Sequence, residues 1–203
     1  MSALPLAFTA SWAAGINPYL LVLLLSLAGR FGLADVPDGL ERTDVLVIFA
    51  VLTVVDTIAD KIMWLDSGWD AVNTVIRPVA GAVVAALIAA PSTDIPAVAL
   101  AAGGGAVALV THVAKATTRL AVNTTPEPFS NIALSVGEDV AVAGTVAVAL
   151  ANPWLAGGIA LFFLVAGVGV ALAVAALARK GLRRLDRMRR SSPDGHDTGR
   201  MAA

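Results

Sequence analysis

The sequence predicts an all-α protein, a polytopic transmembrane helical bundle with about six spans. Hydrophobic residues make up 58% of the 203-residue chain and charged residues only 14%, whereas a typical soluble domain has about 25% charged residues. The mean hydropathy is +0.81. The apolar residues also lie in long uninterrupted runs, which is typical of helices that cross a bilayer.

Several classes of protein chemistry have no signature in this chain. The absence of cysteine excludes a disulfide framework and a thiolate metal site. The sequence contains no Walker loop, no dinucleotide-binding fingerprint, no Gly-x-Ser-x-Gly elbow and no histidine pair at metal-binding spacing. We therefore expect neither an enzyme nor a bound cofactor, and we leave a metal site undecided.

We expect one transmembrane domain over residues 1–178. Its spans are predicted at residues 4–33, 45–64, 70–90, 97–122, 129–150 and 154–178. The sixth carries no charge and is expected to face lipid, while the charged spans two to five enclose their polar side chains. Three consecutive glycines at residues 103–105 permit either close packing of the fourth span or an unwound stretch.

The first span is expected to break at Asn17 and Pro18, because proline lacks a backbone N–H and disfavours helix at the residue before it. Asn17 is then either a cap for the break or a binding group. Residues 66–68 are predicted to form the turn after the second span. Asp70 and Arg77 share the polar side of an amphipathic turn that we expect at the membrane interface, and Pro78 should redirect the chain.

Residues 179–203 form a basic, polar tail that we expect to be disordered. The positive-inside rule places this tail in the cytoplasm, and six spans then place the N-terminus there too. We expect a bacterial inner (plasma) membrane protein with both termini cytoplasmic. The tail is predicted to touch anionic lipid headgroups rather than nucleic acid.

Ten polar residues within or beside the spans are the candidates for a functional site. They are Asn17, Asp56, Asp60, Lys61, His112, Lys115, Arg119, Asn131, Glu138 and Asp139. A charge at membrane depth costs about 3 kcal/mol on insertion scales, so we expect these acids and bases to meet. A rise of about 1.5 Å per residue places Asp56, His112 and Glu138 at one level near the middle of the core.

Two hypotheses follow for these charges. Carboxylate oxygens suit hydrated cations, and histidine is the residue type whose ordinary pKa lies nearest physiological pH. The chain is therefore predicted to be a small transporter or channel for a cation, a proton or a small solute. Alternatively, the charges only pair and lock the bundle, as in an accessory or scaffold subunit of a larger membrane complex. A homo-oligomer is compatible with both.

Several motifs resemble a bacterial family of small multi-pass integral membrane proteins that is identified as a domain of unknown function. They are Gly15-Ile-Asn-Pro-Tyr-Leu, Ala59-Asp60-Lys61, Asp66-Ser-Gly-Trp-Asp-Ala-Val, Ile76-Arg-Pro and the run from Thr111 to Asn131. The resemblance covers residues 10–170. It implies a multi-pass membrane protein and brings no established activity.

A second resemblance concerns Asp56-Thr-Ile-Ala-Asp60-Lys61. This stretch is similar to the Glu-x-Gly-Asp-Lys-Thr motif of small cation exporters of the manganese and calcium type, with Asp56 in place of Glu and Ala59 in place of Gly. Those exporters carry the motif twice, in inverted repeats, and Glu138 with its neighbours is the nearest second copy here. The resemblance implies a three-plus-three inverted repeat and cation transport.

Overall fold

A computed structural model describes residues 2–122 and 128–191, apart from the side chains of Met63, Trp64, Asp66, Ser67, Pro128, Asn131 and residues 184–191. Every regular element in this part is helical, so the all-α prediction is confirmed. The elements are α1 (Ala3–Ile16), α2 (Pro18–Arg30), η1 (Asp38–Leu40), α3 (Thr43–Ala59), α4 (Met63–Ala89), η2 (Ala90–Ser92), α5 (Ala97–Val122), α6 (Pro128–Ala151) and α7 (Pro153–Ser191).

Four helical stretches are long and apolar enough to cross a membrane. They are Gly68–Ser92, Ala97–Val122, Ile132–Ala151 and Pro153–Arg183. The chain therefore has the helices of a transmembrane protein. Hydroxyl side chains inside these helices are satisfied locally: Thr111 and Thr118, for example, donate to carbonyls four residues earlier, which removes the cost of an unpaired polar group in lipid.

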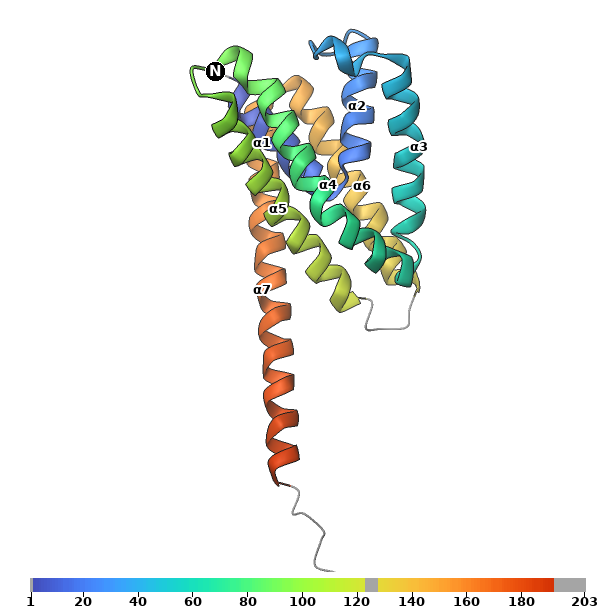
Figure 1. Ribbon diagram of the computed structural model, residues 1–203, viewed down its shortest axis with the longest axis vertical. Helices are drawn as coiled ribbons and strands as arrows, with labels where there is room; N and C mark the ends of the chain where they lie inside the picture. Colours follow the sequence, from blue (N-terminus) through green and yellow to red (C-terminus); the bar gives the residue numbers. More distant parts are fainter. Residues whose placement is uncertain (1, 123–127, 192–203) are drawn as a thin grey trace, which may run out of the picture.

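The first apolar run, expected as one broken span, is instead a pair of short helices that reverses direction. Figure 1 shows α1 entering the bundle beside the N-terminus and α2 returning to the same end. Helices of 14 and 13 residues are each only about 20 Å long, too short to cross a ~30 Å core. The end of the bundle to which α2 returns carries a pocket whose lining includes Ser2, Asp35 and Pro91. We call this end the N-terminal face.

The reversal occurs at Asn17 and Pro18 because the sequence ends one helix and begins another there. The Asn17 side chain accepts a hydrogen bond from the Leu20 amide at 2.9 Å, and Pro18 occupies the first turn of α2. Both are preferred helix-start features. Asn17 is thus a cap, one of the two roles expected for it.

The opposite end of the bundle, which we call the tail face, carries the turn between α3 and α4. This turn lies at Asp60–Ile62, where the amides of Lys61 and Ile62 bond carbonyls three residues back. The prediction of a turn at residues 66–68 is wrong, because these residues already belong to α4. Helix α4 also continues through Pro78 instead of ending there, and Figure 1 shows it bending.

Helices α4 and α5 approach closely at the predicted triple glycine. A Cβ on Gly104 would collide with Ala85 and with the carbonyl oxygen of Gly81, whereas a Cβ on Gly103 would meet nothing within 4 Å. The stretch stays helical. Of the two alternatives, close packing is the one observed.

This contrast predicts the effect of adding one methyl group. Gly104→Ala should lower the thermal stability of the purified protein, because a rigid Cβ would displace backbone at the α4–α5 contact. Gly103→Ala is the matched control and should be neutral or slightly stabilising, because alanine favours helix by up to about 1 kcal/mol over glycine. Equal unfolding midpoints for the two variants, measured in the same detergent, would contradict the packing described.

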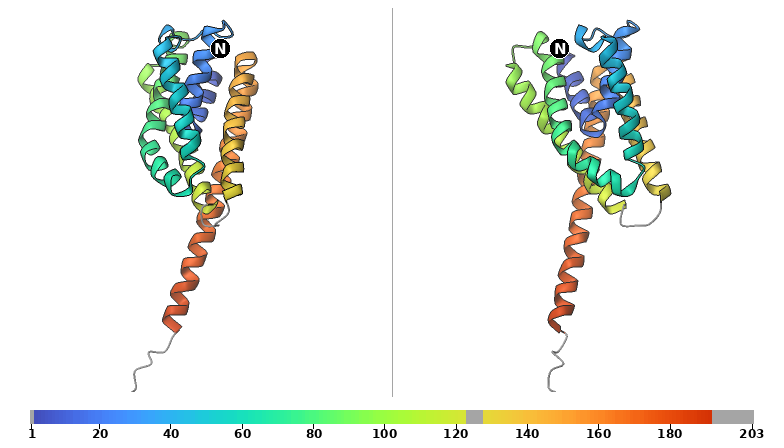
Figure 2. Two further views of the ribbon diagram at one scale, coloured as in Figure 1. Left: turned by 90° about the vertical axis from the view of Figure 1, so that its right-hand side faces the viewer. Right: turned by 45° about the vertical axis from the view of Figure 1, so that its right-hand side comes forward.

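Helix α7 lies at the edge of the bundle and extends well beyond it. Figure 2 shows its C-terminal part running past the tail face, away from the other helices. Only 6% of the most apolar stretch of α7 is buried inside the protein, as expected for a lipid-facing segment. The boundary predicted at residue 178 is not a helix end, since α7 continues to Ser191; residues 192–203 lie outside the described part.

The side of the membrane on which each terminus lies stays a prediction. The N-terminus and the C-terminal end of α7 lie at opposite ends of the molecule in Figure 1, whereas six complete spans would have placed both on one side. The difference arises because α1 and α2 together enter and leave by the same face. The three-plus-three inverted repeat stays a prediction.

Candidate functional site

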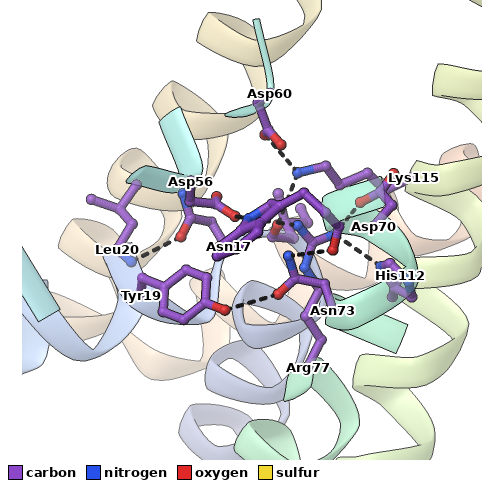
Figure 3. Close-up of polar contacts among 12 residues, drawn as sticks. Asn17, Tyr19, Leu20, Asp56, Asp60, Asp70, Asn73, Arg77, His112 and Lys115 are labelled. Atoms are coloured by element: carbon purple, nitrogen blue, oxygen red, sulfur yellow. Dashed lines mark hydrogen bonds and ion pairs between the residues drawn. The ribbon is translucent and has the colours of Figure 1, made fainter. Parts of the chain in front are cut away.

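Arg77 is the centre of the first of two clusters of buried charge (Figure 3). Its guanidinium lies 3.3 Å from Asp70 and 3.7 Å from Asp56. Asp56 also accepts a 2.6 Å hydrogen bond from the indole N–H of Trp69. The side chains of Arg77 and Asp56 are both completely buried, so helices α3 and α4 are joined by an ion pair shielded from solvent.

His112 of α5 completes this first cluster. Its Nδ1 lies 2.9 Å from Nη1 of Arg77, and its Nε2 lies 3.0 Å from the Thr74 hydroxyl. Because a guanidinium can only donate, Nδ1 must accept and the proton must be on Nε2. The Thr74 hydroxyl accepts from Nε2 and donates to the Asp70 carbonyl at 2.9 Å. His112 is therefore neutral in this arrangement.

The second cluster joins α3, α5 and α6 near the tail face. Asp60 accepts from Lys115 and from Arg119, each at 2.9 Å. Glu138 lies 2.6 Å from Arg119 and 3.3 Å from Lys115. Two acids and two bases thus form a closed square of ion pairs. Its geometry satisfies both charge and hydrogen bonding in a region where an unpaired charge is costly.

The break between α1 and α2 is tied to this second cluster. Lys115 donates to the carbonyl oxygen of Ile16 at 3.1 Å, which gives a partner to a carbonyl at the end of α1. The Asn17 amide donates to Asp139 at 3.1 Å. The re-entrant pair therefore reaches the polar interior through both its backbone and its capping side chain. The role of Asn17 as a binding group stays a prediction.

Acids outnumber bases in the two clusters, which we together call the ionic network. Among the described side chains that hydrogen-bond or ion-pair within it, the carboxyls are Asp56, Asp60, Asp70, Glu138 and Asp139, and the bases are Arg77, Lys115 and Arg119. His112 is neutral. The network therefore has a surplus of two carboxyl groups. Uncompensated charge here would be expensive, so we expect a proton, a cation or the nearby Lys61 to balance it.

The structure brings most of the ten predicted site residues together but not all. Lys61 donates to the carbonyl of Thr57 at 3.0 Å rather than to a carboxyl of the network, although its charge acts on Asp139. Asn131 belongs to α6, and its side chain falls outside the described residues. Within the described residues, no group of three His, Asp or Glu side chains is placed to hold a metal ion.

Asp70 and Arg77 were expected at the interface and are instead inside the protein, where Arg77 is 0% exposed. The expectation failed because an amphipathic first turn looks the same whether its polar side faces water or a polar interior. Their spacing did indicate that the two side chains could pair, because Asp70 and Arg77 are seven residues apart, two helical turns, and so share one face of the helix. Tyr19, which donates to Asn73 at 3.1 Å, had no such signal.

The fold and the site together define a helical membrane protein with an ionic network enclosed by its helices. The chain belongs to the family described as "Domain of unknown function (DUF4126)", whose profile matches residues 4–179. No curated protein and no solved structure matches the chain. The predicted membership of a family of unknown function is confirmed, and the resemblance to cation exporters is not supported.

Proposed function

We propose that this protein is a small transporter or channel for protons or small cations, with the ionic network as the place where charge is taken up. The surplus of two carboxyl groups carries the proposal. A network built only to lock helices needs equal numbers of acids and bases, whereas this one has three bases for five carboxyls. Intramembrane carboxyls of this kind mark proton relays and ion pathways in other membrane proteins.

The broken helix pair supports the same proposal. Discontinuous helices that end in the interior are a recurring way to build transport sites, because their free backbone groups can line a polar path. Here the Ile16 carbonyl at the break contacts Lys115. A change in the charge of the network would act directly on this contact, and through it on the position of α1 and α2.

The proposal includes a state closed toward the N-terminal face. A pocket of about 580 Å³ opens there, lined by side chains that include Asp35, Asp38, Leu25 and Val84. Leu25 and Val84 also belong to the apolar core that extends to Ile16. Apolar packing thus separates this pocket from the network, as alternating access requires of one side at a time.

The orientation follows from the basic segment of α7, which places the tail face in the cytoplasm by the positive-inside rule. The chain has no native cysteine, and Gly39 and Gly181 both have open space for a side chain. In intact cells an impermeant maleimide should label Gly39→Cys, while Gly181→Cys should react only after lysis. Labelling of both from outside, or of Gly181→Cys alone, would contradict the orientation.

Ion flux into liposomes containing the purified protein tests the function itself, with manganese, calcium, sodium and a pH gradient as the panel. A second candidate function, an accessory subunit of a larger complex, is favoured by the pairing of acids and bases at 2.6–3.7 Å. That alternative predicts no flux for any ion of the panel and one stoichiometric partner on purification in mild detergent.

A further inference from the structure

A second pocket lies against the ionic network. It has a volume of about 360 Å³, is half open, and is walled by α1, α5, α6 and α7. Its lining is mainly apolar and includes Trp12, Phe163 and Leu134. Because the lining residues of α5, α6 and α7 all lie within membrane-length helices, we expect the open side to face lipid.

The polar end of this pocket is formed by Lys115 and Glu138, the two charged residues among its lining. The Lys115 ammonium donates hydrogen bonds to Ile16 and Asp60 and lies 3.3 Å from Oε2 of Glu138. Both ion pairs of Glu138 are made by Oε2, and Oε1 has no partner within the described part of the chain. The lining of the pocket therefore includes a carboxyl group with one oxygen that no described residue engages, beside an ammonium whose contacts are already with protein oxygens.

The side walls suit a bulky, apolar ligand. Trp12 stacks on Phe163 with ring centroids 5.6 Å apart and planes 16° from parallel. Phe163 is the exposed ring of this pair, and Trp12 lies buried behind it, so one wall is aromatic. The volume lies within the range of about 300 to 1,000 Å³ that is usual for small-molecule sites. Aromatic walls combined with a carboxylate recognise organic cations, through the ring quadrupole and the charge.

We propose that this pocket binds a lipophilic organic cation that enters from the bilayer, with its positive centre against Oε1 of Glu138 and its apolar body against the wall formed by Trp12 and Phe163. The assignment deepens the proposed function and rests on it for the role of the network, but equilibrium binding can be measured without any transport.

A pair of probes of nearly equal size and opposite charge tests the assignment. Tetraphenylphosphonium and tetraphenylborate are titrated into the full-length protein in phosphatidylcholine nanodiscs, with empty nanodiscs subtracted. We expect saturable binding of the cation and none of the anion. Glu138→Gln should weaken cation binding by about tenfold or more, because the amide keeps the shape and loses the charge.

Two variants of α6 locate the site. Gly137 lines the pocket and Gly144 does not, yet a Cβ at either position would meet nothing within 4 Å. Gly137→Leu should fill the pocket and abolish saturable binding of tetraphenylphosphonium, whereas Gly144→Leu should bind like wild type. Ala133→Leu, at another exposed lining position, is a second filling variant with the same expected loss.

Equal binding of the two probes would overturn the proposal, as would cation binding that survives both Gly137→Leu and Ala133→Leu. The absence of saturable binding above empty nanodiscs would overturn it as well. Failure here is distinguishable from failure of the proposed function: inorganic ions could still cross the membrane without this pocket, and the pocket could bind its ligand in a protein that transports nothing.

Discussion

Replacing Asp60 with asparagine should lower the free energy of unfolding by about 3 to 5 kcal/mol, the usual cost of breaking a buried ion pair. One oxygen of Asp60 accepts from both Lys115 and Arg119 at 2.9 Å. The amide would leave these two cations with Glu138 as their remaining counter-charge in the square. Denaturant or thermal unfolding of the purified variant in detergent measures the loss.

Asp44→Asn, at the opposite end of α3, provides the matched control. Asp44 also pairs with an arginine, Arg42, at 2.7 Å, but its side chain is 56% exposed. Exposed pairs contribute little to stability because water screens them, so this variant should unfold like wild type. If Asp60→Asn were as stable as Asp44→Asn, the square of ion pairs would not hold the bundle together.

Replacing Asp56 with asparagine should leave the protein folded and abolish ion flux, in contrast to the loss of stability expected for Asp60→Asn. Asparagine keeps a side-chain oxygen that can accept the hydrogen bond from Trp69. Arg77 keeps its ion pair with Asp70 at 3.3 Å. Oδ2 of Asp56 is buried without a hydrogen-bond partner among the described residues, so the substitution breaks no hydrogen bond there. The bond it weakens is the 3.7 Å ion pair with Arg77, which is longer than the 2.9 Å contacts of Asp60. It removes one of the surplus carboxyls on which the proposed charge uptake depends.

The sequence predicted the helical class and most of the network because both follow from the cost of charge in lipid. That cost requires acids such as Asp60 and Glu138 to find bases such as Lys115 and Arg119, and the structure brings these four together. The pairing of particular partners could not be predicted, because it depends on how helices rotate and cross.

The reversal at Asn17 was beyond the sequence for a different reason. A run of thirty apolar residues has the length of a span, and a break in it can produce either a kink or a re-entrant pair. The choice depends on tertiary partners, here the contact of Lys115 with Ile16 and that of Asn17 with Asp139. Local helix signals reveal where the chain breaks but not in which direction it continues.

The expectations for Pro78 and Arg77 were wrong for two different reasons. Proline is tolerated inside α4 since the freed backbone groups can be satisfied by neighbours. An arginine one residue before it was assigned to the interface, yet it is fully buried among Asp56, Asp70 and His112. The first cluster would have been found by treating the polar side of α4 as inward-facing.

The most direct test of the central claim is ion flux in liposomes containing wild-type protein or Asp56→Asn, at equal protein density and with unfolding midpoints measured in parallel. The account predicts flux of protons or of at least one cation of the panel in wild type, and none in a variant that remains folded. Undiminished flux in folded Asp56→Asn, or no flux in wild type for any member of the panel, would contradict it.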